Sequence, residues 1–153
     1  MTGNERNFKI PLSDLEFGNL LGKGGYGAVF RGKWKSKHMT VALKKTLIGP
    51  EVADANMMGL LGQHPNIVSF YAYATDHPHT ISVLELAENG SLYDYLYKAN
   101  KKPDLAQSVN WAQDIAYGMA HLHNHDIVHR DLKSQNILFS TRMVAMVSDY
   151  GTA

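Results

Sequence analysis

Short apolar runs fill the first half of the chain, and most alternate with polar positions at the period of a β-strand. Such runs occur at five places, residues 15–21, 28–31, 40–44, 67–70 and 81–84. Glycine-rich or short polar turns separate several of them. We therefore predict a five-stranded, largely antiparallel sheet in this half.

The remaining apolar positions follow helical spacing. A Gly-Pro pair precedes a helix predicted over 51–61, in which Met57, Met58 and Leu61 share one face. A short helix is predicted from Ser91. A longer one carries a single apolar stripe, made of Leu105, Val109, Ala112, Ile115, Met119 and Leu122. Two short runs, 136–139 and 143–147, predict a small hairpin. The fold class expected is α+β.

Composition limits the kinds of partner. The 153 residues carry a formal charge of +1 and no Cys, so neither a disulfide nor a strong field for nucleic acid is expected. No stretch approaches the roughly 20 apolar residues of a membrane span. We expect a soluble, cytoplasmic protein without membrane insertion. Residues 1–13 are polar and unpatterned, which predicts a mobile arm.

Glycines interrupt the first two predicted strands in the pattern Gly22-x-Gly24-x-x-Gly27. In a dinucleotide-binding fold the third glycine opens a helix, whereas here a β-patterned segment follows it. The context therefore favours a hairpin whose backbone N–H groups cover phosphates, because no Cβ holds the ligand away. A plain glycine turn remains an equal alternative on this motif alone.

Three further motifs carry groups suited to phosphate chemistry. Lys44 ends the strand segment Val-Ala-Leu-Lys, where the alternative is an edge lysine reaching water. The segment His-Arg-Asp-Leu-Lys-Ser-Gln-Asn at 129–136 places an acid, a cation and an amide in one loop. Asp149 then opens Asp-Tyr-Gly and adds a second carboxylate able to bind a metal.

Taken in order, these motifs resemble those of a eukaryotic protein kinase, G-x-G-x-x-G-x-V, V-A-x-K, H-R-D-L-K-x-x-N and D-x-G, over about residues 15–153. Lys133 resembles the serine/threonine-specific pattern. The segments at 88–92 and 149–153 resemble the tyrosine-kinase-like group, especially mitogen-activated protein kinase kinase kinases such as the TGF-β-activated and mixed-lineage kinases.

The resemblance implies that ATP and Mg²⁺ are the cofactors. Lys44 would hold the α- and β-phosphates, and Asn136 and Asp149 would ligate Mg²⁺. Asp131 would orient the substrate hydroxyl and accept its proton, while Lys133 would neutralise the γ-phosphate. The protein substrate would bear serine or threonine, with a MAP kinase kinase as the partner considered.

The resemblance also assigns the groups around the nucleotide. Val29 and Ala42 would enclose the adenine, Leu84 would lie behind it, and the backbone from Glu85 to Ala87 would hydrogen-bond the base. The phosphate-covering glycines would be those of the first hairpin, namely Gly22, Gly24, Gly25 and Gly27.

Lobe boundaries follow from the same resemblance. Residues 14–87 would form the N-terminal lobe and 88–153 part of the helical C-terminal lobe. The activation segment and the A-P-E motif are not in the sequence, so we expect the chain to be partial and to show little or no protein phosphorylation on its own. A non-catalytic nucleotide-binding or interaction fragment is the alternative function.

Two positions depart from the kinase pattern. The helix acid that pairs with Lys44 has no obvious match; Asp54 is favoured, Glu51 is second, and a solvated Asp54 is the remaining alternative. Tyr150 stands where phenylalanine is usual, and its hydroxyl needs a partner if buried.

Two residue groups invite other functions. A metal site could be drawn from His121, His123 and His125, although a solvated helix end fits their spacing better. A nucleic-acid surface could be drawn from Arg31, Lys33, Lys35 and Lys37, with Trp34 opposite, but the solvated outer face of a strand is favoured.

Overall fold

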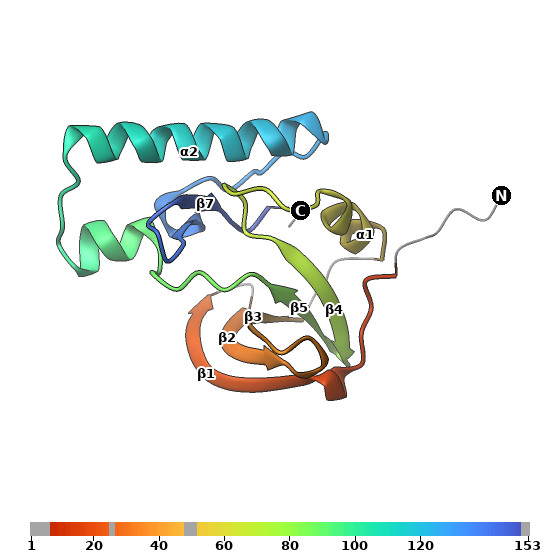
Figure 1. Cartoon of the computed structure of the whole chain (residues 1–153). Helices are drawn as coiled ribbons and strands as arrows, with labels where there is room; N and C mark the ends of the chain where they lie inside the picture. The colour runs from red at the N-terminus through yellow and green to blue at the C-terminus, as the bar shows by residue number, and fades with distance from the viewer. Residues whose placement is uncertain (1–6, 25–26, 48–51, 151–153) are drawn as a thin grey trace. The chain divides into compact units, whose positions relative to one another are not determined.

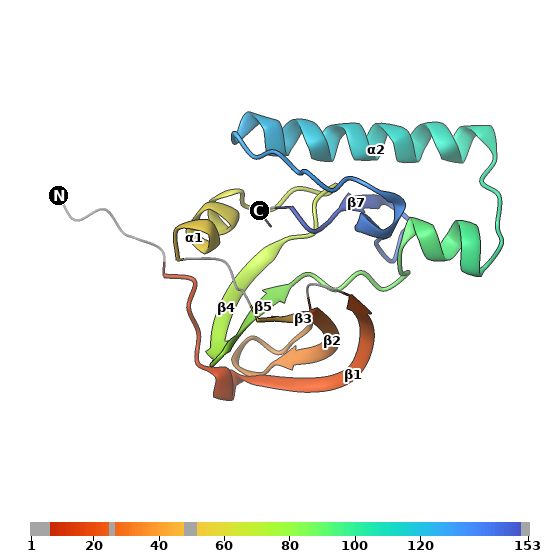
Figure 2. The ribbon, with the colours of Figure 1, turned by 180° about the vertical axis from the view of Figure 1, so that it is seen from behind.

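The computed structural model describes residues 7–24, 27–47 and 52–150. It divides into two units, one of Met1–Gly62 with Ser69–Leu86 and one of Gln63–Val68 with Ala87–Ala153. Each unit has its own sheet and helix, visible in two opposite views (Figures 1 and 2). Among the described residues, no helix combines the length and the apolar character needed to cross a membrane.

The first unit is built on a curled sheet. Its strands are β1 (Leu15–Gly24), β2 (Gly27–Trp34), β3 (Met39–Thr46), β4 (Phe70–Asp76) and β5 (His79–Leu84). They pair antiparallel in the order β1-β2-β3-β5-β4, which confirms the predicted five-stranded antiparallel sheet (Figure 1).

Alternation along β3 explains how this sheet is packed. Val41 and Leu43 are fully buried in a cluster that also contains Trp34 and Val83. The intervening Ala42 and Lys44 lie on the opposite face, because successive side chains of a strand point to opposite sides. One face of β3 therefore belongs to the core, and the other presents the predicted nucleotide-binding residues.

Helix α1 (Val52–Leu60) follows β3 and agrees with the helix predicted over 51–61. Ala55 is fully buried and packs in a cluster with Phe70 and Tyr73 of β4. The chain leaves the helix at Gly62, whose φ of +64° suits glycine.

The structure differs from the predicted mobile arm at residues 8–13. Ile10 donates its N–H to the carbonyl of Tyr73 at 2.8 Å, and a short helical turn, η1 (Leu12–Asp14), follows. Asp14 accepts hydrogen bonds from Trp34 Nε1 and from the backbone and hydroxyl of Ser36, and the hydroxyl bond lowers the pKa of this carboxyl. The polar sequence of this segment gave no indication of these hydrogen bonds to residues far away in the chain.

The strand predicted at 67–70 is also misplaced. Strand β4 begins only at Phe70. Ile67 instead pairs with Val147 of strand β7 (Ala145–Val147), and Val68 donates its N–H to the Val147 carbonyl; all three residues belong to the second unit. Ile67 and Val68 are both buried there, so their apolar character reflects burial rather than a place in the five-stranded sheet.

The second unit combines helices with a small hairpin. Its elements are η3 (Asp94–Lys98), α2 (Leu105–Asn124), η4 (Ser134–Asn136), β6 (Ile137–Phe139) and β7. Strands β6 and β7 pair antiparallel, as the sequence predicted. The Asp104 carboxylate caps α2 by accepting from the Gln107 N–H at 2.8 Å, which satisfies a donor that the helix leaves open.

The buried face of α2 is not the whole predicted stripe. Its buried residues are Trp111, Gly118 and Leu122, whereas Leu105 is 80% exposed and Val109 is 56% exposed. Trp111 donates Nε1–H to the carbonyl of Met143. Trp111 and Gly118 therefore lie on the contact face of α2, although the apolar stripe predicted from the sequence included neither of them.

Candidate functional site

The first hairpin contains two kinds of glycine. A Cβ placed on Gly22 or Gly24, at the end of β1, would meet no described atom within 4 Å. Gly27 has a φ of +144°, and its Cβ would lie 2.1 Å from the carbonyl oxygen of Lys45. Packing therefore requires glycine at 27, while the first two leave their backbone open to an approaching group. Gly25 lies outside the described residues.

The predicted nucleotide-binding side chains lie on one face of the central strands. Cross-strand pairs join Val29 to Lys44 and Ala42 to Leu84. Because Ala42 and Lys44 alternate with the buried Val41, this face is opposite the main apolar cluster. The first unit thus brings Val29, Ala42, Lys44 and Leu84 onto neighbouring strands.

The acid predicted to pair with Lys44 stays a prediction. Asp54 lies within α1, but the structure does not describe its side chain. Glu51 lies outside the described residues. The adjacent Lys45 bonds to Asp76 at 3.4 Å. Lys45 is therefore a natural control for Lys44, because it is the neighbouring lysine on the opposite face of β3.

Glu85 combines a used backbone donor with a buried carboxyl. Its N–H donates to the carbonyl of Ser69 at 2.9 Å, so this donor is not available for a base. Its Oε2 is buried and has no hydrogen-bond partner among the described residues. Burial raises the pKa of Glu85, and burial followed by the charge of Glu85 raises that of Tyr71. The burial of the Glu85 carboxyl was not predicted from the sequence, which suggested a role only for its backbone.

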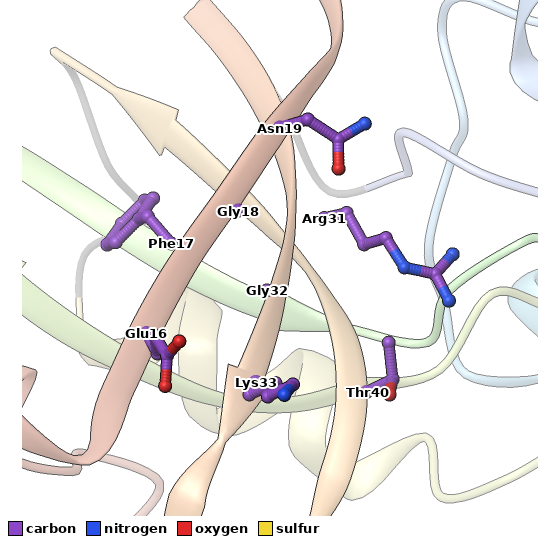
Figure 3. A pocket seen from close by; sticks show the side chains of 8 residues that line it. All are labelled: Glu16, Phe17, Gly18, Asn19, Arg31, Gly32, Lys33 and Thr40. Carbon is purple, nitrogen blue, oxygen red and sulfur yellow. The ribbon is translucent and has the colours of Figure 1, made fainter.

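A pocket of about 280 Å³ opens on the sheet of the first unit. Figure 3 shows Asn19, Arg31 and Thr40 projecting from three strands to the same side, with Phe17 turned away. Its wall is completed by Glu16, Gly18, Gly32 and Lys33.

The predicted basic face, made of Arg31, Lys33, Lys35 and Lys37, does not lie along one extended strand. β2 ends at Trp34, and Lys35 and Lys37 lie in the helical turn η2 (Lys35–Lys37). Lys37 Nζ lies 5.8 Å from the centroid of the Trp34 ring, a cation–π contact. All four basic residues were predicted to lie on one extended segment, but the strand ends before Lys35 and Lys37.

In the second unit, His129 joins two of the predicted motifs. Its side chain is buried, and Nε2 lies 2.6 Å from the carbonyl of Ser148. Its Nδ1 accepts the N–H of Asp131 at 3.1 Å. Because a carbonyl can only accept, the proton is on Nε2, and one neutral ring bridges the backbone of the two segments. We predicted no role for this histidine, although it opens the motif that contains Asp131.

Two of the four predicted catalytic residues, Asp131 and Lys133, lie in one loop with the predicted metal ligand Asn136. Lys133 Nζ lies 3.2 Å from Asp131 Oδ2. Asn136 Nδ2 donates to the backbone carbonyl of Asp131 at 2.8 Å and lies 3.3 Å from its Oδ2. The Asn136 amide is thus oriented with Nδ2 on Asp131, which leaves Oδ1 as the atom suited to a metal. Lys133 and Asn136 both set the position of the Asp131 carboxylate.

Asp149 follows a segment fixed to this loop. Ser148 donates both its N–H and its hydroxyl to the carbonyl of Asn136, at 2.9 and 3.0 Å. Asp149 itself is exposed and has a φ of +57°, a conformation that costs free energy for a residue with a side chain. The backbone thus holds the two predicted metal ligands on segments that are bonded to each other.

Tyr150 is buried, and its hydroxyl donates to the carbonyl of Val68. This contact answers the departure noted in the sequence, because the added hydroxyl has the partner that burial demands. Gly151 lies outside the described residues.

Histidines at the end of α2 form a stack rather than a metal cluster. The rings of His64 and His121 are 4.6 Å apart, as are those of His121 and His125. Within the described parts of the chain, no group of three or more His, Asp or Glu residues is arranged to hold a metal ion. The sequence did not indicate that His64 would join the stack.

A curled antiparallel sheet with a glycine hairpin and a strand lysine, followed by a loop of Asp131, Lys133 and Asn136, defines a protein of the kinase-like class. Residues 15–153 match the family model described as protein tyrosine and serine/threonine kinase. The chain therefore belongs to the protein kinase family, which confirms the resemblance found in its motifs.

Several curated relatives are similar over almost the whole chain. Mitogen-activated protein kinase kinase kinase 13-A of Xenopus laevis is 35% identical over 97% of this chain and 15% of its own length. Serine/threonine-protein kinase STY46 of Arabidopsis thaliana is 34% identical over 95% of this chain and 26% of its own length. The chain thus spans about a quarter or less of the length of these relatives.

Proposed function

We propose that the chain binds MgATP and transfers its γ-phosphoryl group to a serine or threonine hydroxyl of a protein. The observation that carries the proposal is the arrangement of Asp131, Lys133 and Asn136 within one hydrogen-bonded loop. Phosphoryl transfer needs positioned charge more than covalent chemistry from the protein. An acid, a cation and a metal-capable amide in fixed positions meet that need.

Each residue of the loop has a separate role in the proposed reaction. The Asp131 carboxylate orients the substrate hydroxyl and accepts its proton. Lys133, 3.2 Å from Asp131, supplies a positive charge for the γ-phosphate. His129 holds the Asp131 backbone through its Nδ1, so the base is positioned by a buried ring.

The residues present also fit MgATP. Gly22 and Gly24 leave space where a Cβ would lie, as a phosphate-covering turn requires. Lys44 would hold the α- and β-phosphates, and Val29, Ala42 and Leu84 would surround the base. Because the Glu85 N–H is used, base recognition falls to its carbonyl or to the backbone of Ala87.

Asn136 Oδ1 and the Asp149 carboxylate are the oxygen ligands that Mg²⁺ prefers. When bound, Mg²⁺ would neutralise charge on the phosphates. Two protein ligands suffice, because this ion usually takes its remaining ligands from water and phosphate oxygens.

The substrate class rests on two supports. Lys133 matches the serine/threonine-specific pattern, and two relatives carry the names of a MAP kinase kinase kinase and a serine/threonine-protein kinase. We therefore propose a place in a MAP kinase cascade, with a MAP kinase kinase as substrate.

Nucleotide binding is tested by thermal unfolding with and without millimolar MgATP. A ligand at 100 times its dissociation constant stabilises a protein by about 2.7 kcal/mol, which gives a clear shift. We expect Lys44→Met to abolish the shift and Lys45→Met to retain it, because Lys45 bonds to Asp76 instead. An unchanged shift in Lys44→Met would assign Lys44 a structural role.

Transfer is tested with radiolabelled ATP and a generic protein substrate, followed by phosphoamino-acid analysis. Labelled serine or threonine that disappears in Asp131→Asn supports the proposal. Asp126→Asn is a control, because Asp126 is also an exposed aspartate but lies outside the motif at 129–136. Because we expect little or no transfer from this chain on its own, the assay is repeated on a chain extended with an activation segment and an A-P-E motif. MgATP binding without any transfer by the extended chain would replace the proposed enzyme by the non-catalytic nucleotide-binding alternative.

A further inference from the structure

The N-terminal strap, defined as Asn7–Ile10, adds a short parallel segment to the edge of β4. Tyr73 donates its N–H to the carbonyl of Phe8 at 2.9 Å, and Ile10 returns a bond to the carbonyl of Tyr73 at 2.8 Å. Phe8 and Ile10 are half-buried, whereas Asn7 and Lys9 are exposed. Figures 1 and 2 show the described N-terminal segment running from near α1 along β4.

The ring of Phe8 occupies a notch in α1. A Cβ built on Gly59 would lie 2.1 Å from Phe8 Cζ and 2.4 Å from both Cε atoms. The ring also meets Phe70 edge-on, with centroids 6.2 Å apart. Glycine in a helix interior costs about 1 kcal/mol relative to alanine, so its presence at 59 calls for a packing reason. Phe8 supplies that reason.

Among the side chains of helix α1 that the structure describes, Ala55 and Met58 are the other contacts with the apolar cluster. The helix spans nine residues, and isolated helices shorter than about 12–15 residues are marginal in water. Ala55 is fully buried, but Leu60 is 68% exposed and Met57 is 40% exposed. A buried alanine offers little apolar area, so Phe8 and Met58, which both pack against the cluster of Ala55, Phe70 and Tyr73, contribute most of the described apolar contact of α1.

We infer that Phe8 is a positioning residue, whose ring in the Gly59 notch fixes α1 and thereby the helix acid that is predicted to orient Lys44, with Asp54 as the favoured residue. The inference rests on the proposed function, since it assigns the strap a role in nucleotide binding. All parts of the argument lie in the first unit. Lys44 on β3 connects through β5 to β4, and β4 carries both the strap and the Ala55 cluster.

A double-mutant cycle tests the contact without reference to nucleotide. In the wild-type chain, Gly59→Ala should lower the thermal midpoint, because the new methyl collides with the Phe8 ring. In a Phe8→Ala chain the same substitution should raise the midpoint, because the collision is gone and alanine favours helix. The same sign in both backgrounds would overturn the docking of Phe8 on α1.

The functional part is tested by titrating MgATP. We expect Phe8→Ala to raise the dissociation constant roughly three- to tenfold, with faster amide hydrogen exchange in α1. Phe8→Leu should restore most of the affinity, because it refills the notch with an apolar side chain. Leu12→Ala is the matched control, since Leu12 packs against the other apolar cluster, and it should leave the affinity unchanged.

The outcomes separate the two proposals. Equal losses of affinity in Phe8→Ala and Leu12→Ala would reduce Phe8 to a general contribution to stability and overturn the inference. If the wild-type chain fails to bind MgATP, the proposed function falls together with the nucleotide-binding role of the strap. The double-mutant cycle would then still decide whether Phe8 holds α1.

Discussion

Glycine has different roles at neighbouring positions of the first hairpin. At Gly27 the positive φ and the close carbonyl of Lys45 exclude a side chain. At Gly22 and Gly24 the described protein leaves open space, so neither position is explained by packing. The two roles predict different consequences for the same chemical change.

We predict that Gly24→Ala weakens MgATP binding about tenfold, or about 1.4 kcal/mol, and leaves stability almost unchanged. The added methyl would stand between the backbone and a phosphate but meets no atom of the described residues within 4 Å. Isothermal titration and urea unfolding measure the two quantities.

Gly27→Ala is the contrasting variant. It should cost about 1–3 kcal/mol of stability, because alanine must adopt a strained backbone. A stable Gly27→Ala protein, or undiminished affinity in Gly24→Ala, would contradict this division of roles.

At the level of elements, the loop at 63–68 contacts both α2 and the β6–β7 hairpin of the second unit. The Asn66 side chain donates to the carbonyl of Ala145, and its own carbonyl accepts the Val147 N–H. Gly118 of α2 lies against this carbonyl, where a Cβ would come within 2.4 Å. His64 Nδ1 accepts the Asn66 N–H at 3.0 Å, so the histidine stack borders the turn that holds β7.

This arrangement predicts an acid-sensitive contact. Burial lowers the pKa of His64 below its ordinary 6.5, and the charge of His121 acts in the same direction. The unfolded chain therefore binds this proton more readily than the folded chain does. The stabilising contribution is complete above about pH 6.5 and is lost as the pH falls toward the lowered value.

Urea unfolding at about pH 7.5 and pH 5.5 measures the effect. His64→Gln should reduce the loss of stability on acidification, because it removes the group that charges on unfolding. His123→Gln is the control, since His123 is exposed on α2. A loss as large in His64→Gln as in the wild type would assign the pH dependence to other groups.

Local periodicity predicted the strands and helices better than their partners. The run at 40–44 was predicted as a strand and forms β3, in which the structure buries Val41 and Leu43, because a strand with one buried face imposes a period of two. The run at 67–70 was equally apolar, yet its first residues bond to β7. The spacing of apolar residues indicates which side chains are buried, but it does not indicate which distant strand they pack against.

The candidate site divides in the same way. Asp131, Lys133 and Asn136 were predictable, because phosphate chemistry needs these groups and they lie within one short motif. The bridge from His129 to Ser148 and the docking of Phe8 on Gly59 were not predictable, since each joins residues far apart in sequence. Asp54 remains a prediction.

For the whole molecule, the exposed start of α2 affects behaviour in solution. Leu105 and Val109 are 80% and 56% exposed, and Tyr117 on the same helix is 53% exposed. Exposed apolar groups of this kind promote association. The sequence stripe predicted apolar surface on this helix, although the structure places most of it in the first turns.

We predict that the double substitution Leu105→Lys and Val109→Lys lowers self-association and changes stability by no more than about 0.5 kcal/mol. Both side chains are already exposed, so little burial is lost. Sedimentation velocity over a range of concentrations measures association. Leu122→Lys is the contrasting variant, because Leu122 is fully buried and its replacement should unfold the protein. Unchanged association in the double variant would show that another surface is responsible.

The single ring of His129 connects the two proposed binding functions, that of Asp149 for metal and that of Asp131 for the acceptor hydroxyl. Its Nε2–H holds the carbonyl next to Asp149, and its Nδ1 holds the N–H of Asp131. A cation that draws Asp149 toward itself must either carry this ring along or break one of its bonds. By reciprocity, a hydroxyl group that favours one orientation of Asp131 must change the affinity for the cation by the same factor. Metal and acceptor substrate would therefore bind cooperatively or antagonistically, and not independently.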